Sequence, residues 1–223
     1  MPGVIKNICS VPANEVLDRI DRATLFRDRW QFGRIGSRKR VEMELQLLKR
    51  WAELASKSNW SAQAVYGSFP AVAVDNDLIL FSGNGKTGKI RLTFSPRFGP
   101  KLLRQLPGKE LAIGLQVVTL GLKASRFLAR LRKLGSPSER FLWHGLAAEA
   151  TEAAAEWLSQ RAAEKMGWDK TRRISPGYPA WPELSEQRKV FAILRPRRIG
   201  VRLTETYQMV PEYSTSALVL PAR

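Results

Sequence analysis

The chain of 223 residues, 44% of them apolar, is long enough to bury a substantial core, and we expect one domain over residues 1–223. It has no apolar run of membrane-spanning length, no secretory signal pattern and a single cysteine, so we expect a cytoplasmic protein without an intramolecular disulfide. A single histidine excludes multi-histidine zinc sites, and the net charge of +17 indicates a surface that attracts polyanions or acidic partners.

The first predicted elements are helices in the N-terminal part of the chain. Apolar residues recur at helical spacing over residues 13–32, which predicts one amphipathic helix or two short ones. Asp21 lies within this pattern, where a carboxylate is typical of a helix N-cap or of a solvated side chain. A second amphipathic helix is predicted from the basic triplet 38–40 to Leu54.

After residue 62 the pattern changes from helical to extended. The next segments are rich in β-branched and aromatic residues, or they alternate between apolar and polar residues. Strands are therefore predicted over residues 64–74, 78–81, 89–94 and 111–121.

The triplet Gly85-Lys86-Thr87 invites comparison with a phosphate-binding loop. That loop needs a glycine five positions before Gly85, where this chain has Leu80, and it needs a helix after it, where a strand pattern follows. We therefore exclude a phosphate-binding loop and predict a hairpin connection over residues 82–88.

The region from Lys86 to Lys133 is strongly basic, and Glu110 is its only acidic residue. Residues 122–134 are predicted to form a helix that carries a basic stripe on one face. The stripe consists of Lys123, Arg126, Arg130 and Lys133. Either this region binds an acidic partner or nucleic acid, or it is a solvated surface that keeps the protein soluble.

A long alanine-rich helix is predicted over residues 139–165, with Ser138 as its cap. Its small side chains allow another element to approach closely. The helix places Glu152 and Glu156 on one face, and the pattern leaves open whether that face meets solvent or a ligand.

A proline-rich stretch, residues 173–182, follows this helix. Its three prolines fix φ, and Gly177 between them permits a sharp turn, so the backbone is expected to be stiff and extended. Such a ribbon offers backbone donors and acceptors, a guanidinium from Arg173 and the ring of Tyr178. These groups suit a small ligand with a carboxylate and a flat base, and the alternative is a proline-rich surface connector.

The last predicted elements are a helix over residues 185–194 and strands over residues 199–207 and 214–220. Helices and strands are intermixed, with hairpin connections, and they do not alternate as regular βαβ units. The sequence therefore predicts an α+β fold with a largely antiparallel sheet.

The spacing Arg173-x-x-x-Gly177-Tyr178, followed by Pro-Ala-x-Pro, resembles the S-adenosylmethionine-binding motif of the activation (reactivation) domain of vitamin B12-dependent methionine synthase. Four other stretches are similar to the same family and occur in its order. They are Ile20-Asp21 with Phe26 and Trp30, residues 64–71 with Asn76-Asp77, residues 146–158, and residues 199–207 with Pro211.

This resemblance implies a C-shaped α+β domain whose twisted antiparallel sheet is flanked by helices. The family's domain holds S-adenosylmethionine over the cobalamin of a neighbouring module, so that an inactive cobalt can be reduced and remethylated. Carried onto the matching positions, it implies that Asp21 and Glu152 face the ligand's ammonium or ribose and that Arg173 binds its carboxylate. The backbone beside the adenine and ribose would come from Gly177, Tyr178, Pro179 and Ala180.

The resemblance also implies that no catalytic residue and no metal is needed, because the sulfonium methyl group is already activated and only has to be positioned. Three features depart from the family. Trp181 replaces a common cysteine, the segment 167–172 is short, and the chain stops at Arg223 without the family's C-terminal tyrosine-bearing tail.

We therefore expect a free-standing reactivation protein that binds S-adenosylmethionine and docks on a separate cobalamin-binding methionine synthase module or other corrinoid protein. Whether it is an enzyme in its own right stays open. The alternative is a basic protein that keeps the fold for docking to an acidic partner or nucleic acid, without a working ligand site. A methyltransferase acting on another acceptor is a third reading, for which the sequence offers no general base.

Overall fold

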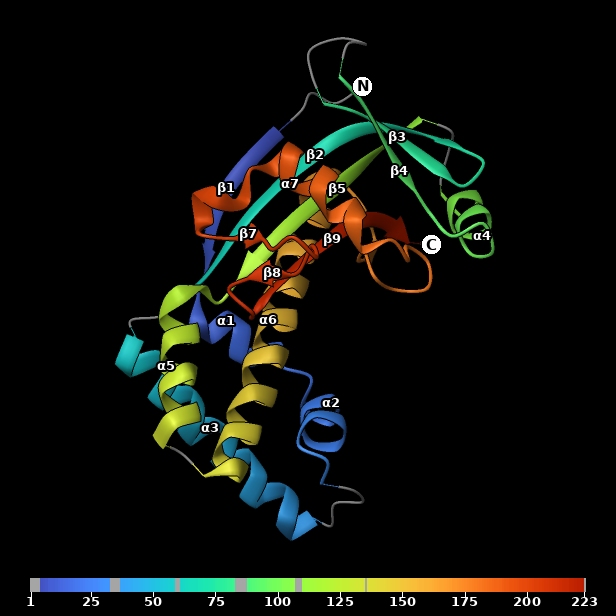
Figure 1. Ribbon diagram of the computed structural model, residues 1–223. Coiled ribbons are helices and arrows are strands. Elements are labelled where there is room, and N and C mark those ends of the chain that lie inside the picture. The colour runs from blue at the N-terminus through green and yellow to red at the C-terminus, as the bar shows by residue number, and fades with distance from the viewer. Residues whose placement is uncertain are drawn as a thin grey trace.

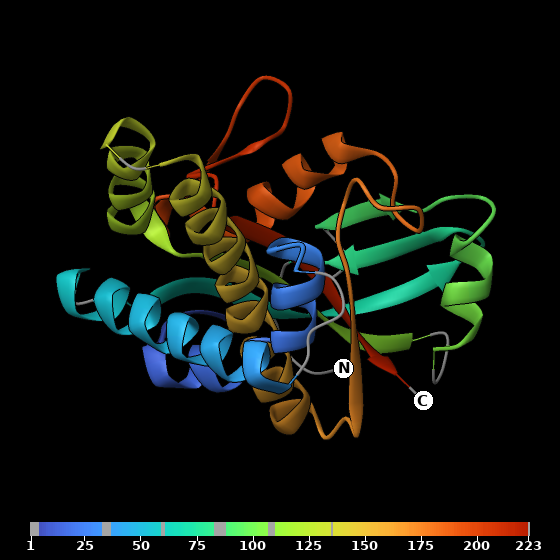
Figure 2. The same ribbon diagram turned by 90° about the horizontal axis from the view of Figure 1, so that it is seen from below.

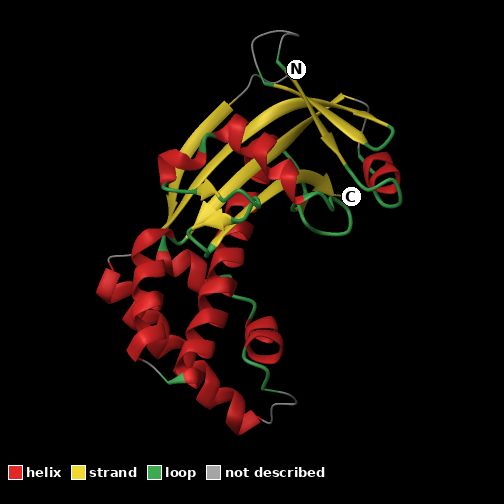
Figure 3. Cartoon of the chain, in the orientation of Figure 1, coloured by secondary structure: helices red, strands yellow, loops and turns green. Residues whose placement is uncertain are grey.

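The computed structural model describes residues 5–32, 37–58, 61–82, 88–106, 110–134 and 136–222. Strands gather at one end of the molecule and most helices at the other, which gives the chain a bent outline (Figure 1). Figure 3 shows this division by colour. The long helix α6 (Pro137–Met166) joins the two ends, since its C-terminal half packs on the sheet and its N-terminal half lies among the other helices.

Seven strands form one antiparallel sheet in the order β4-β3-β2-β5-β9-β6, and β1 also pairs with β2. The long strand β2 pairs with β5 along one edge, while its other edge is shared by β1, opposite residues 62–68, and β3, opposite residues 71–74. The strands are β1 (Ile5–Val11), β2 (Ala62–Val74), β3 (Asp77–Phe81), β4 (Lys89–Thr93), β5 (Glu110–Thr119), β6 (Lys170–Ile174) and β9 (Ser214–Ala222). This arrangement confirms the predicted α+β class with an antiparallel sheet.

The remaining elements are shorter helices and one small hairpin. The helices are α1 (Ala13–Asp18), α2 (Arg22–Thr24), the π-helix η1 (Leu25–Arg29), α3 (Ser37–Ser58), α4 (Gly99–Arg104), α5 (Gly121–Leu134), the 3-10 turn η2 (Leu184–Glu186), α7 (Gln187–Leu194) and the 3-10 turn η3 (Pro196–Ile199). The hairpin joins β7 (Arg202–Leu203) to β8 (Met209–Val210).

The two faces of the sheet belong to two hydrophobic cores. Along β5, Ile113, Leu115 and Val117 face the core that includes α7. Gln116 lies between them in the sequence and points the other way, where its Nε2 donates to the Ala155 carbonyl of α6 at 3.1 Å. Figure 2 shows α6 and α7 on opposite sides of the sheet. The alanines of α6 therefore allow the close approach that the sequence predicted.

The N-terminal helical pattern is interrupted at Asp21 rather than continuous. Residues 13–32 form α1, α2 and η1, and Asp21 is the N-cap of α2. The cap of α6 is Ser136, whose Oγ accepts from the Glu139 N–H at 3.2 Å, so the prediction of Ser138 was wrong by two residues. Pro137 occupies the first turn, a position that tolerates proline because its N–H would have no helical partner.

The predicted strand over residues 199–207 is also wrong. Only Arg202–Leu203 pairs, with Met209–Val210, because the backbone turns at Gly200 (φ 77°) and Tyr207 (φ 63°). The hairpin predicted over residues 82–88 includes Gly85-Lys86-Thr87, which lies outside the described residues; β3 and β4 on either side of it pair antiparallel.

Several elements were not predicted, among them β1, β6 and α4. The strand β6 has a polar sequence and pairs, among the described strands, only with β9, so it lacks the apolar pattern of a buried strand. The strand β1 mixes apolar and polar residues without a regular alternation. The helix α4 was interpreted as a break because it begins with Gly99-Pro100, yet proline at the start of a helix fits its first turn.

Trp181 anchors the turn that follows β6. Its side chain is fully buried, and its ring lies 5.2 Å from that of Phe94 between centroids. The backbone joins the same region, since the Ser95 N–H donates to the Ala180 carbonyl at 3.0 Å. Trp181 therefore fixes the turn to the core.

We expect Trp181→Ala to lower the free energy of unfolding by about 3–5 kcal/mol, because it leaves a large cavity in the core. Urea denaturation followed by fluorescence or circular dichroism measures this change. Trp181→Phe should lower the free energy of unfolding much less. It keeps an aromatic ring and removes an indole N–H that has no hydrogen-bond partner among the described residues. Equal losses in both variants would contradict the account.

Candidate functional site

The edge strand β6 directs successive side chains to opposite sides of the sheet. Arg173 points to α6, where its Nη1 donates to Glu152 Oε2 at 3.0 Å. Arg172 points to α4, where its Nη1 donates to Gln105 Oε1 at 3.0 Å. Ile174 is buried in the core with α7. Because β6 is paired with β9 as a strand, its two adjacent arginines contact different elements, one at the end of α4 and the other on α6.

Arg173 is held by two carboxylates of α6. Besides the bond to Glu152, its Nε lies 3.2 Å from Glu156 Oε2. The arginine side chain is 22% exposed, and the glutamates are 39% and 43% exposed. The face shared by the two glutamates, which the sequence left unassigned, therefore meets β6 and remains open to solvent.

The turn after β6 uses several of its own backbone groups. The Gly177 N–H donates to the Trp181 carbonyl at 2.8 Å, and the Trp181 N–H donates to the Tyr178 carbonyl at 2.9 Å. Gly177 has φ +90°, and a Cβ there would lie 3.3 Å from Leu184 Cδ1, so this position requires glycine. The stretch that was predicted to be extended is therefore a hydrogen-bonded turn after Ile174, and it uses part of its own backbone groups.

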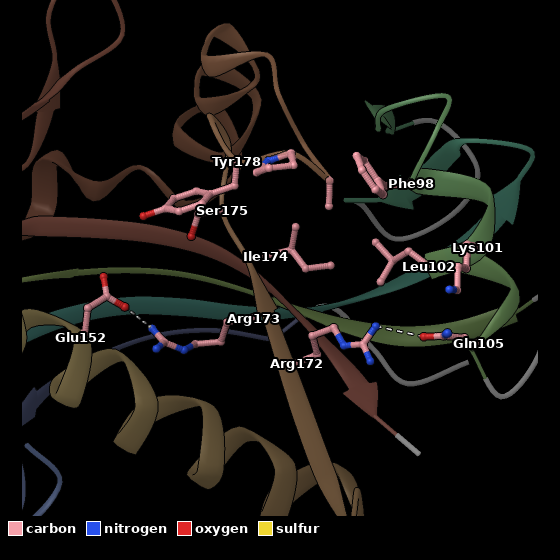
Figure 4. A pocket seen from close by; sticks show the side chains of 12 residues that line it. Phe98, Lys101, Leu102, Gln105, Glu152, Arg172, Arg173, Ile174, Ser175 and Tyr178 are labelled. Carbon is pink, nitrogen blue, oxygen red and sulfur yellow. Dashed lines mark hydrogen bonds and ion pairs between the residues drawn. The ribbon is translucent and has the colours of Figure 1, made fainter. Parts of the chain in front are cut away.

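A pocket of about 640 Å³ lies between this turn, β6 and α4 (Figure 4). Five of the seven residues proposed from the sequence line it: Glu152, Arg173, Tyr178, Pro179 and Ala180. Gly177 lies in the same turn without lining the pocket. Tyr178 is 66% exposed and forms one wall, so the pocket opens to solvent beside an aromatic ring.

Asp21 is not among the described residues that line the pocket. Its Oδ1 accepts from the Thr24 N–H at 3.1 Å, and its Oδ2 accepts from the Thr24 hydroxyl at 2.7 Å. These hydrogen bonds lower the pKa of Asp21 below its usual value. In the structure Asp21 is an exposed N-cap, one of the two roles that its sequence position indicated.

The sequence analysis missed the α4 wall of the pocket, because α4 itself was missed. This wall consists of Phe98, Lys101, Leu102 and Gln105. Phe98 is 41% exposed and lines the same pocket as Tyr178. The spacing of Lys101 and Gln105, four residues apart, is the sequence signal that could have placed them on one helix face.

Glu149 is a second residue that the sequence analysis did not single out. It lies one turn before Glu152 on α6, is only 5% exposed, and pairs with Arg29 Nε at 3.3 Å. Burial raises the pKa of Glu149, the Arg29 charge opposes this, and Asp21 and Glu152 add to the increase. A row of carboxylates therefore runs along α6 towards the pocket.

Two kinds of feature are missing from the described residues. No three histidine, cysteine, aspartate or glutamate side chains gather as the ligands of a metal would. None of the described helices combines the length and the apolar character that crossing a membrane requires.

Comparison with protein families gives a match over residues 102–222 to the family described as vitamin B12 dependent methionine synthase, activation domain. The chain is 29% identical over 209 residues to the methionine synthase of Mycobacterium tuberculosis, covering 78% of this chain and 18% of that protein. It is 28% identical over 215 residues to the methionine synthase of Mycobacterium leprae, covering 78% and 17%. The chain thus spans less than a fifth of the length of these relatives.

A solved structure has the same fold. It is a crystal structure of the MetH reactivation domain bound to AdoHcy, which matches 99% of this chain and 78% of that chain with a TM-score of 0.79 and 22% identity. The expected fold, an antiparallel sheet flanked by helices, is confirmed by this match.

We expect the stability difference between wild type and Glu149→Gln to depend on pH. Because burial raises the pKa of Glu149, the folded protein binds a proton more tightly at this site than the unfolded chain does. Proton binding at Glu149 therefore contributes fully to the stability of the folded protein below the unfolded pKa of about 4.3. This contribution is lost as the pH rises through the pKa of Glu149 in the folded protein.

Urea denaturation between about pH 4 and pH 7 measures this dependence, and the wild type should lose stability relative to Glu149→Gln as pH rises. Glu164→Gln changes an exposed glutamate of the same helix and serves as the control. If the wild type instead became more stable relative to Glu149→Gln as the pH rises, the ion pair with Arg29 would outweigh the effect of burial on Glu149.

Proposed function

Because the chain belongs to the family of the vitamin B12-dependent methionine synthase activation domain, we propose that its pocket beside Arg173 binds S-adenosylmethionine. The bound ligand would present its methyl group to a cobalamin held by a separate corrinoid-binding module of methionine synthase. The observation that carries this proposal is that Arg173 and Glu152, which have opposite charges, line one pocket next to the Gly177 turn.

The amino-acid part of the ligand would take over an existing ion pair. Its carboxylate would replace Glu152 at the Arg173 guanidinium, and its ammonium would take the released Glu152 carboxylate. Glu156 would keep its contact with Nε and hold the guanidinium in place. Binding then exchanges one set of charge pairs for another, which avoids leaving a half-buried charge without a partner.

The adenosine part would lie along the Tyr178-Pro179-Ala180 wall. The exposed Tyr178 ring offers a face for a planar base, and backbone groups of the turn that it does not use internally are available for hydrogen bonds. The AdoHcy bound to the structurally similar reactivation domain contains the same adenosine and amino-acid parts, which supports this assignment.

Asp21 would contribute by charge, towards the ligand's ammonium or ribose. Its carboxylate is close enough to raise the pKa of Glu149, so it acts on the same row of carboxylates as Glu152. Its hydrogen bonds to Thr24 lower the pKa of this carboxyl group further below its usual value.

S-adenosylmethionine itself supplies an activated methyl group, and the partner protein would carry the cobalamin that receives it. The residues of this chain would bind and orient the ligand, without acting as a nucleophile or general base. The protein is then an accessory component of methionine synthase that supports remethylation of an inactive cobalamin.

We expect isothermal titration calorimetry to show saturable binding of S-adenosylmethionine and AdoHcy to the wild type. Arg173→Gln should weaken both by about 10- to 100-fold, because a charge-assisted hydrogen bond is worth about 1.5–3 kcal/mol. Arg126→Gln changes an exposed arginine of α5 and should bind like the wild type. Absent binding by the wild type, or equal affinities in Arg173→Gln and Arg126→Gln, would contradict the proposal.

As a second function we propose nucleic-acid binding by the basic face of α5. Lys123, Arg126, Arg130 and Lys133 are all exposed on this helix, whose sequence contains no acidic residue. Ala124 and Leu128 on the opposite face are buried, so the basic side chains form a continuous outer stripe.

Gel-shift titrations with duplex DNA and RNA test this second function. Binding should fall about tenfold or more between 50 mM and 200 mM salt and should be lost when Lys123, Arg126 and Arg130 are all changed to glutamine. Salt-insensitive binding, or none at 50 mM salt, would exclude it.

A further inference from the structure

One end of the pocket is basic, and the proposed ligand does not account for it. Figure 4 shows Lys101, Gln105 and Arg172 together at the α4 end, while Glu152 and Ser175 lie at the other. Arg172 and Lys101 come from different elements, β6 and α4, and both side chains are exposed to solvent. The fold thus brings two cations to one side of the same cavity.

Arg172 bonds to the neutral amide of Gln105, and in the part of the chain that the structure describes no carboxylate contacts Lys101 or Arg172. Arg173, the third cation that lines the pocket, is paired with Glu152 and Glu156, so the excess positive charge lies at the α4 end with Lys101 and Arg172. The pocket alone therefore favours an anionic occupant.

S-adenosylmethionine increases this imbalance. It carries a sulfonium, an ammonium and one carboxylate, so it is a cation entering a positively charged pocket. AdoHcy lacks the sulfonium and is neutral overall. If nothing else bound, the charge of the pocket would favour AdoHcy over S-adenosylmethionine, which is the wrong preference for a protein that has to supply a methyl group.

We infer that the α4 end of the pocket is a second subsite, which binds an oxyanion of the phosphate class and thereby favours the cationic ligand. The donors match this chemistry: Lys101 offers an ammonium, and Arg172 offers a planar guanidinium. The Gln105 side-chain oxygen accepts from Arg172, so the NH₂ group of the same amide can donate to an anion. The anion is either free phosphate or a phosphate group built into a larger molecule.

The coupling between the two subsites rests on the proposed function, whereas the anion subsite itself does not. The two are therefore measured separately. Binding of inorganic phosphate is followed by 31P NMR titration, in parallel with dimethyl phosphate as a model of a phosphodiester. The wild type should shift and broaden the signal of at least one of them, and which one binds more tightly tells a free anion from a built-in phosphate.

The test variant is Lys101→Gln combined with Arg172→Gln, and each single change is measured as well. Arg104→Gln is the matched control, because Arg104 lies on the same helix, is exposed, and bonds to the Pro100 carbonyl rather than lining the pocket. Phosphate binding should be lost in the double variant and kept in Arg104→Gln. No binding by the wild type, or equal binding by the double variant, would overturn the inference.

Calorimetry then measures the coupling, with ionic strength held constant by sodium chloride. Phosphate should tighten S-adenosylmethionine binding by about fivefold in the wild type, should tighten AdoHcy binding less, and should have no effect in the double variant. Equal tightening of both ligands would overturn the electrostatic coupling. If S-adenosylmethionine does not bind at all, the proposed function fails, and the phosphate titration still decides whether the anion subsite exists.

Discussion

The site depends on the ion pairs that Arg173 of β6 makes with Glu152 and Glu156 of α6. They fix an edge strand, which pairs with the sheet on one side only, to the helix that joins the two ends of the molecule. Because the arginine is half-buried and its partners are partly exposed, the pairs are strong enough to set the geometry and open enough for a ligand to exchange. The position of the pocket follows from this contact.

The rest of the fold positions α6 and the end of β6, which carry the two partners of this ion pair. On one side, buried alanines let α6 lie close to β5, as the bond from Gln116 to the Ala155 carbonyl shows. On the other side, Trp181 packs against Phe94 and fixes the turn that follows β6. The pocket therefore lies between two rigid walls, and α4 closes it with a third that carries its own charges.

The sequence predicted the α+β class, the antiparallel sheet and the long helix, because these depend on periodicity and on alanine content. It also brought together Glu152, Arg173, Tyr178, Pro179 and Ala180, through the resemblance to a family rather than through spacing. It failed where local pattern and tertiary context disagree. Lys170–Ile174 is too polar to indicate a strand, although β9 pairs with it, and Gly99-Pro100 suggested a break where a helix starts. The pairing of Arg173 with Glu156 and the approach of the α4 wall to Arg172 could not be predicted, since they require knowing which elements lie side by side.

The most direct test of the central claim is a crystal structure of this protein with bound AdoHcy. The ligand should occupy the pocket between β6, α4 and the Gly177 turn, with its carboxylate on Arg173 in place of Glu152 and its ammonium towards the α6 carboxylates. An intact Arg173–Glu152 pair with the ligand bound elsewhere on the molecule would contradict it.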